Sequence, residues 1–298
     1  MEYHNPVLLK ESIEGLNIKP DGIYVDVTFG GGGHSREILS RLNEKGKLFA
    51  FDQDEDAKRN MIDDERFTLI PQNFRFIKRY LRFYGVKKVD GVLADLGVSS
   101  HQFDEAKRGF STRFDAALDM RMNQGDGLSA FDVVNKYSEE KLSNVLFQYG
   151  ELRNARAIAK KIVEIRSEKI IKTSFELKEV LNEFVPKAVE HKVLAQIFQG
   201  IRIEVNQEIE ALKEFLLQMP EILNEEGRLS VISYHSLEDR LVKRFIRNGL
   251  FEGEPEKDFY GNVNVPMKKV GKMIIPSFQE IKKNNRARSA KLRIATLK

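Results

Sequence analysis

The sequence predicts an α/β protein in which a parallel, doubly wound sheet is interrupted by an all-helical insertion. Segments typical of strands and of helices alternate over the first hundred residues. From about residue 128 to 217 the pattern is almost entirely helical, and strand-like segments return only at 227–233 and 291–297. Such alternation is typical of a parallel sheet with helices on its faces, in which ligands bind at the carboxyl ends of the strands.

The elements of the first hundred residues follow from their apolar patterns. Short segments rich in β-branched and aromatic residues predict buried strands, and apolar side chains at helical spacing predict the helices between them. The expected strands are 22–29, 47–52, 67–70 and 89–95, and the expected helices are 34–46 and 74–85.

The helical stretch predicts a second domain. It contains a capping box from Thr173 to Glu176, which marks the start of a helix. We expect residues 1–107 and 209–298 to form one discontinuous domain, and residues 108–208 to form a helical domain inserted between its fourth and fifth strands.

Composition narrows the class of protein. Of the 298 residues, 41% are apolar and 32% are charged, which is ordinary for a globular protein. The chain has no cysteine, so disulfides and thiolate metal sites are excluded, and a reducing cytoplasm is the expected location. The opening residues show neither a signal peptide nor a membrane span.

Positive charge is concentrated near the end of the chain. Residues 262–298 contain ten Lys or Arg and a single acid, Glu280, which suits binding to a phosphate backbone. The alternative is a solvated terminus, but the strand-like alternation of 291–297 predicts that this segment is packed. Arg153, Arg156 and Lys160 are expected on one face of a helix, either as a second phosphate track or as a solvated face.

The stretch DVTFGGGGHS, residues 26–35, contains four consecutive glycines directly after the first expected strand. A P-loop would require Gly-Lys-Ser/Thr after the glycines, and a dinucleotide fingerprint would place a third Gly where Ser35 stands. Glycines that follow Asp26 and let backbone amides approach a nucleoside, with Asp52 ending the second strand to accept the ribose hydroxyls, fit better. A dehydrogenase would share Asp52. In a methyltransferase, Asp26 could help to hold the amino-acid end of S-adenosylmethionine.

Three of the five histidines follow expected strand ends. His34, His101 and His235 are predicted to converge on one crevice at the carboxyl edge of the sheet. A single histidine in such a loop is more often a helix cap than a catalyst, but three from separate loops favour a functional site.

Several longer motifs carry a family resemblance. They are HNPVLL, TFGGGGHS, ADLGVSSHQFD, RGFS, LDMRM, IRIEVNQEIEAL, HSLEDRLVKRF and RARSAKLRIA, in order along the chain. The chain resembles the bacterial 16S ribosomal RNA cytosine-N4 methyltransferases, the MraW or RsmH family. The resemblance implies a class I S-adenosylmethionine-dependent, Rossmann-like fold with a helical insertion. It also implies methylation of N4 of one cytidine in the decoding region of 16S ribosomal RNA, with the small ribosomal subunit as partner.

The resemblance also assigns cofactor contacts. They fall on Gly32, Gly33, His34, Asp52, Phe74, Asp95 and Gln102. Asp52 suits the ribose, and Asp95 suits the adenine or the approach to the methyl group. Phe74 could pack on the adenine face or belong to the core. No metal ligand set is predicted.

The reaction requires hydrogen-bond acceptors for the target amine, because the N4 lone pair of cytosine is delocalised into the ring. Asp95, Ser99, Ser100 and His235 are the candidates, and we favour Asp95 and His235 as catalytic. Tyr234, where the family usually has Phe, could stack on the target base. The Pro-Pro-aromatic motif of many amino-directed methyltransferases is absent after Asp95, so the chemistry of that motif cannot be assumed.

Two other classes remain open from the sequence: an NAD-dependent dehydrogenase on the same sheet, and a non-catalytic RNA-binding ribosome assembly factor. The oligomeric state, a homodimer included, is also left open.

Overall fold

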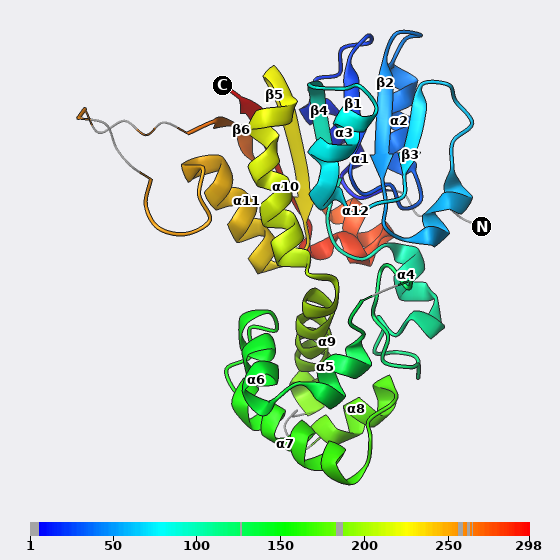
Figure 1. Cartoon of the computed structure of the whole chain (residues 1–298), viewed down its shortest axis with the longest axis vertical. Helices are drawn as coiled ribbons and strands as arrows, with labels where there is room; N and C mark the ends of the chain where they lie inside the picture. Colours follow the sequence, from blue (N-terminus) through cyan, green and yellow to red (C-terminus); the bar gives the residue numbers. More distant parts are fainter. Residues whose placement is uncertain (1–5, 126, 183–186, 256–258, 261–262, 264) are drawn as a thin grey trace. The chain divides into compact units, whose positions relative to one another are not determined.

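The computed structural model describes residues 6–125, 127–182, 187–255, 259–260, 263 and 265–298 (Figure 1). His4 and Asn5 of the HNPVLL motif lie outside the described residues. The chain divides into two compact units, Met1–Gly97 with Ile209–Lys298, and Val98–Glu208. The boundary between Glu208 and Ile209 is the one expected from the sequence. The boundary between Gly97 and Val98 lies ten residues before the one expected between residues 107 and 108. The reason is that Val98 and Phe103 already pack on the core of the second unit.

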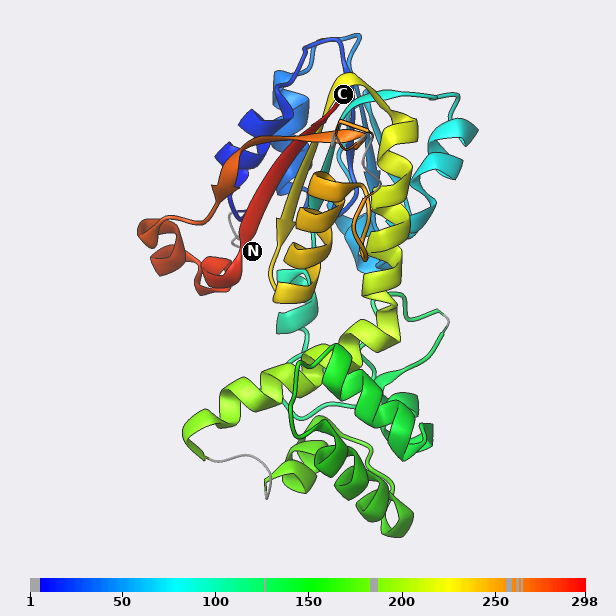
Figure 2. The ribbon, with the colours of Figure 1, turned by 90° about the vertical axis from the view of Figure 1, so that its left-hand side faces the viewer.

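In the described part of the first unit, seven strands form one sheet of order β3-β2-β1-β4-β5-β7-β6. Figure 2 shows β7 between β5 and β6. The strands are β1 (Ile23–Asp26), β2 (Lys47–Phe51), β3 (Phe67–Ile70), β4 (Val89–Asp95), β5 (Leu223–Ser233), β6 (Met267–Ile274) and β7 (Lys291–Leu297).

The expectation of a wholly parallel sheet is wrong at one edge. The first five strands are parallel, but β7 pairs antiparallel with β5, and β6 pairs antiparallel with β7. The segment that joins β6 to β7 contains only a short helix and one 3-10 turn and returns the chain along its neighbour, whereas a parallel pair needs a crossover to the opposite end of the sheet.

Helices cover both faces of this sheet because alternate strand residues point to opposite sides. Val25 packs with the cluster that includes α3 and α10, whereas Tyr24 packs with the cluster that includes α1 and α2. The helices of this unit are α1 (Leu9–Leu16), α2 (Gly33–Arg41), α3 (Ile77–Phe83), α10 (Glu208–Ile222), α11 (Ser236–Asn248) and α12 (Phe278–Lys283).

The described part of the second unit is helical around a core of its own, as the sequence predicted. The capping box from Thr173 to Glu176 is confirmed at the start of α8. Arg153 was wrongly expected within a helix, since it lies in the turn before α7. The helices are α4 (Ser100–Asp104), α5 (Ala130–Lys136), α6 (Glu139–Gln148), α7 (Ala155–Glu168), α8 (Ser174–Leu181) and α9 (Glu190–Asn206).

Among the described residues, no helix combines the length and the apolar character needed to cross a membrane.

Candidate active site

The glycine run connects β1 to α2, and its glycines serve different purposes. Gly30 and Gly32 have φ of 48° and 74°, a left-handed conformation that side chains other than Gly rarely adopt. At Gly33 an added Cβ would lie 2.2 Å from Cγ of Pro6, so this glycine makes room for a protein contact. The turn therefore needs two of the glycines for its shape and a third for packing. The first amides of α2, which begins at Gly33, have no acceptor within the helix and can face a ligand.

Asp26 anchors this loop from inside. Its carboxylate is fully buried and accepts hydrogen bonds from the Ser35 hydroxyl at 2.7 Å and from the Thr28 amide at 3.1 Å. Burial raises the pKa of Asp26. With no exposed surface, this carboxylate cannot contact a cofactor directly, and the loop geometry depends on it instead. Ser35, which departs from the dinucleotide fingerprint, donates the shorter of these two hydrogen bonds.

Asp52 follows β2 and faces the glycine loop. One oxygen accepts from the Gly30 amide at 2.8 Å, and the other accepts from the Asp54 amide at 2.8 Å. Burial raises the pKa of Asp52 to about 6, although both hydrogen bonds oppose the rise. Each carboxylate oxygen can accept a second bond, so Asp52 can hold the loop and still accept the hydroxyls of a ribose.

We predict that Asp52→Ala weakens S-adenosylmethionine binding by about 1 to 3 kcal/mol, the scale of lost hydrogen bonds to a charged acceptor. Parent affinity should also fall as the pH drops through about 6, because the protonated carboxyl accepts fewer bonds. Isothermal calorimetry measures both effects. Asp21→Ala, at the exposed amino end of β1, is the control. An Asp52→Ala affinity equal to that of Asp21→Ala would exclude the ribose role.

Asp95 ends β4, where two hydrogen bonds hold it and His34 lies close by. Its amide donates to the Thr28 hydroxyl at 2.7 Å, Oδ1 accepts from the Tyr234 hydroxyl at 2.8 Å, and Oδ2 lies 3.8 Å from Nδ1 of His34. Burial raises the pKa of Asp95 to about 6, and the hydrogen bond from Tyr234 opposes the rise. Asp95 is therefore mainly a carboxylate at neutral pH, with Oδ2 on the side away from the tyrosine hydroxyl.

His34 supplies a second acceptor beside Asp95. Its Nε2 lies 3.2 Å from the carbonyl of Val7, which can only accept, so we assign the proton to Nε2. Burial lowers the pKa of His34, so the ring is neutral at pH 7 and its contact with Asp95 is not an ion pair. Nδ1 of His34 and Oδ2 of Asp95 are then two adjacent acceptors, an arrangement that suits an incoming N–H donor.

His235 has a structural function in this fold. It is the N-cap of α11 and forms a capping box with Glu238, the role that a lone histidine most often has in such a loop. Nε2 lies 3.1 Å from Oε1 of Glu238, outside hydrogen-bond geometry, and this buried atom has no hydrogen bond within the described chain. That His235 acts on the target amine stays a prediction.

Replacing His235 by Asn would separate these two roles, because Asn is a strong N-cap residue but has no imidazole. If the ring acts on the amine, His235→Asn should slow single-turnover methyl transfer about as much as His235→Ala, by roughly 10² or more. Thermal unfolding measured alongside should show that only the Ala variant loses stability. If His235→Asn transfers the methyl group as fast as the unmodified protein, His235 acts only as an N-cap.

Phe74 and Gln102, which the resemblance assigns to the cofactor, also have contacts within the fold. Phe74 begins the 3-10 turn η2 (Phe74–Phe76) and packs edge-on against Phe215 with ring centroids 5.4 Å apart, so part of its role is in the core. Gln102 belongs to the second unit, where it completes a capping box with Ser99. His101 lies on the same short helix, so of the three histidines expected to converge, two lie in the first unit.

The sequence did not reveal three supporting contacts. The hydroxyl of Tyr234 binds Asp95, the hydroxyl of Thr28 binds the Asp95 amide, and the side-chain amide of Asn60 donates to the Gly30 carbonyl at 2.9 Å. Thr28, next to the glycines, could have been noticed as a polar residue at a strand end. Nothing in the local sequence around Tyr234 or Asn60 predicts their partners.

The site lies where ligands bind in open α/β sheets. A glycine-rich turn after β1, an acid after β2 and an acid ending β4, on this strand order, define a class I S-adenosylmethionine-dependent methyltransferase with a Rossmann-like fold. The chain belongs to the MraW methylase family, whose family model matches residues 1–298, so the resemblance of the motifs is confirmed.

Relatives called "Ribosomal RNA small subunit methyltransferase H" are similar to nearly the whole chain. The protein of Christiangramia forsetii is 69% identical over 295 residues, which cover 99% of this chain and 98% of the relative. That of Flavobacterium johnsoniae is also 69% identical over 295 residues, with the same coverage. That of Bacteroides thetaiotaomicron is 56% identical over 299 residues, covering 100% and 98%.

Proposed function

We propose that this protein methylates the exocyclic N4 of a cytidine in the decoding region of 16S ribosomal RNA. The observation that carries the proposal is the placement of Asp95, a partly buried carboxylate that accepts from Tyr234, lies beside the glycine loop and is next to a second acceptor on His34. The names of the relatives, which specify RNA of the small ribosomal subunit, support the choice of substrate.

The chain's own groups suit an amine substrate. Oδ2 of Asp95 and Nδ1 of His34 would accept the N4 hydrogens, which localises the lone pair and aligns it for in-line attack. When bound, S-adenosylmethionine would supply the methyl group, its S–CH3 bond breaking as the N–CH3 bond forms. One N4 proton leaves as the N–CH3 bond forms, and Asp95, with a pKa of about 6, can receive it and pass it to water.

The cofactor would be held by groups that fit it. Asp52 would accept the ribose hydroxyls, and the first amides of α2, which include those of Gly33 and His34, would approach the amino-acid end. The resemblance adds Gly32, Phe74 and Gln102. Asp26 and Asn60 would act indirectly, by fixing the loop.

We propose that the second unit grips RNA. Arg153, Arg156 and Lys160 are exposed in and just before α7, and within the described residues Lys160 is the one of the three that makes an ion pair, 3.8 Å from Glu164. A ribosomal RNA substrate would place the enzyme in the cytoplasm with the small ribosomal subunit as its partner.

Replacing Arg153 and Arg156 together by Gln should weaken RNA binding and flatten its salt dependence. Each lost phosphate contact removes about 0.7 to 0.9 from the slope of log affinity against log salt. The measurement is filter binding of 16S ribosomal RNA at salt concentrations from about 50 to 300 mM. Lys45→Gln with Lys47→Gln, at the amino end of β2, removes the same charge elsewhere. Equal slopes for the two double variants would contradict the proposed grip.

The function itself is tested by mass spectrometry of 16S ribosomal RNA from cells with and without the gene. Loss of N4-methylcytidine at one position is expected. RNA bound without any methyl transfer would favour an assembly factor, and a methyl group on another atom would overturn the N4 assignment.

A further inference from the structure

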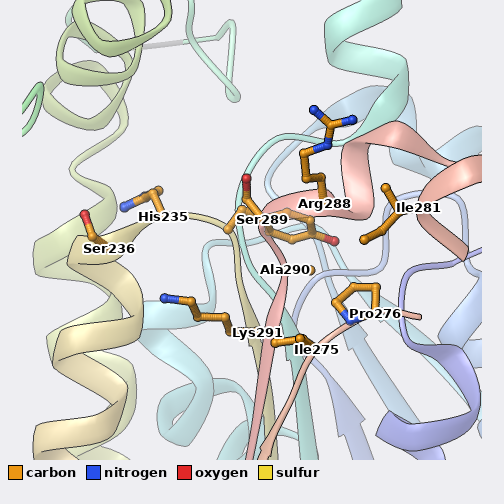
Figure 3. A pocket seen from close by; sticks show the side chains of 10 residues that line it. His235, Ser236, Ile275, Pro276, Ile281, Arg288, Ser289, Ala290 and Lys291 are labelled. Atoms are coloured by element: carbon orange, nitrogen blue, oxygen red, sulfur yellow. The ribbon is translucent and has the colours of Figure 1, made fainter. Parts of the chain in front are cut away.

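The first unit contains a pocket of about 330 Å³ at the carboxyl end of β5. It lies between the loop after β5 and the segment that joins β6 to β7 (Figure 3). Its volume is at the lower end of the range of small-molecule sites, roughly 300 to 1,000 Å³. None of the residues assigned above to the cofactor lines it, whereas Tyr234 and His235 of the candidate active site do.

The walls of the pocket suit a flat ring. Figure 3 shows Ile275, Pro276 and Ile281 along one side, with His235 on the other. The Tyr234 side chain also lines the pocket, and Ile275 is 63% exposed although it is apolar. An aromatic ring beside an exposed aliphatic wall is the arrangement by which proteins hold unstacked bases.

The charges of the pocket suit a phosphate. Arg288 and Lys291 both line it, and no acidic side chain does so among the described residues. Lys291 is paired with Asp239 at 3.4 Å, and Asp239 also accepts from Arg293 at 2.7 Å. Arg288 is exposed and makes no ion pair within the described part of the chain. Its guanidinium is therefore the lining cation that remains available to an anion.

Tyr234 connects this pocket to the candidate catalytic carboxylate. The hydroxyl of the ring that lines the pocket donates to Oδ1 of Asp95 at 2.8 Å. A base stacked on this ring, with its exocyclic amine at the hydroxyl edge, would bring that amine to Asp95. A pocket that only binds a free anion has no need of a hydrogen bond between its wall and Asp95. A pocket that holds the substrate base does need one.

We propose that this pocket receives the target nucleotide of the RNA, unstacked, with its base on Tyr234 and its phosphate on Arg288. The inference rests on the proposed function, because the amine is brought to Asp95 for methylation. The proposal assigns base binding to Tyr234 and phosphate binding to Arg288, and these two contacts together would select a nucleotide rather than a free base.

The experiment fills the pocket without removing a charge. Ser289 is exposed and lines the pocket, so Ser289→Phe should obstruct it, and Ser289→Ala is the control at the same position. We expect Ser289→Phe to slow single-turnover methylation of 16S ribosomal RNA by at least about tenfold, the effect of losing a stacked base. Its S-adenosylmethionine affinity and melting temperature should match those of Ser289→Ala. Equal methylation rates in the two variants would overturn the proposal.

A second measurement does not depend on methyl transfer. Cytidine 5′-monophosphate and cytidine are titrated by NMR into the protein saturated with S-adenosylhomocysteine. Arg288→Gln should weaken binding of the monophosphate by roughly 10-fold or more but leave cytidine unchanged. Lys283→Gln, an exposed charge on α12 outside the pocket, should change neither. Equal losses for both ligands, or none, would contradict the phosphate role of Arg288.

Crosslinking then identifies the bound nucleotide. RNA with 5-iodocytidine at the methylated position should attach to Tyr234 on irradiation, and attachment of Tyr234 to a flanking nucleotide would overturn the assignment to the target. If the monophosphate behaves as expected but the RNA gains no methyl group, the proposed function fails and the nucleotide pocket stands. If the RNA is methylated normally by Ser289→Phe, the pocket assignment fails and the function stands.

Discussion

Asp95→Asn is expected to slow methyl transfer by about 10²- to 10⁴-fold with RNA and cofactor saturating, the range for a positioned acid or base. The hydroxyl of Tyr234 donates to Oδ1, so the amide oxygen of Asn should take that place. The NH2 group would then occupy the place of Oδ2 and present hydrogens where the target amine needs an acceptor. Single-turnover rates measure this effect apart from binding.

The pH dependence gives an independent readout of the same group. The pKa of Asp95 is raised to about 6, so the rate should fall as the pH drops through about 6 and be level above it. Tyr234→Phe removes a hydrogen bond that lowers the pKa of Asp95, so in this variant the fall in rate at low pH should begin at a higher pH. A parent rate for Asp95→Asn, or a fall in rate that begins at the same pH in Tyr234→Phe as in the parent, would count against the carboxylate as acceptor. Cofactor affinity is measured in parallel, because the resemblance also assigns Asp95 a cofactor contact.

Replacing residues 98–208 by a short Gly/Ser linker should abolish RNA methylation and leave cofactor binding largely intact. The described core clusters do not cross the division: one belongs to the second unit, and the other three belong to the first. The sheet, the glycine loop, Asp52 and Asp95 all come from the first unit. Loss of Gln102, which the resemblance assigns to the cofactor, should cost roughly tenfold or less in affinity, the scale of one hydrogen bond.

Calorimetry with S-adenosylmethionine and thermal unfolding by circular dichroism check the shortened protein. The complementary fragment, residues 98–208 expressed alone, is the control and should give a helical circular dichroism spectrum. A shortened protein that does not unfold cooperatively would show that the two units depend on each other. Methylation of RNA by the shortened protein would remove the second unit from substrate recognition.

Local sequence signals determined most of the elements of this protein. The bounds expected for the strands at 67–70, 89–95 and 291–297 are those observed, because each is a short apolar run whose character does not depend on distant residues. The glycine turn and Asp52 were found for the same reason, since a turn shape and a strand-end acid can be read within ten residues.

The edge strand β6 is an element that local sequence signals did not predict. Only Met267 is buried in this strand, and Lys268, Lys269 and Lys272 are exposed. Charged residues are common on an edge, where they discourage pairing with another chain, but they remove the alternation that reveals a strand. Its place, and the antiparallel direction of β7, depend on neighbours that local periodicity cannot specify.

The chemistry of the site was decided by tertiary structure. Asp26 and Asp52 are both strand-end acids in the sequence, but packing buries Asp26 on Ser35 and leaves Asp52 able to accept from a ligand. The bond from Tyr234 to Asp95 joins residues 139 positions apart and exists because β4 and β5 are neighbours in the sheet. Side-chain periodicity is a local property and can be read from the sequence, whereas burial and partner choice arise only when distant segments pack together.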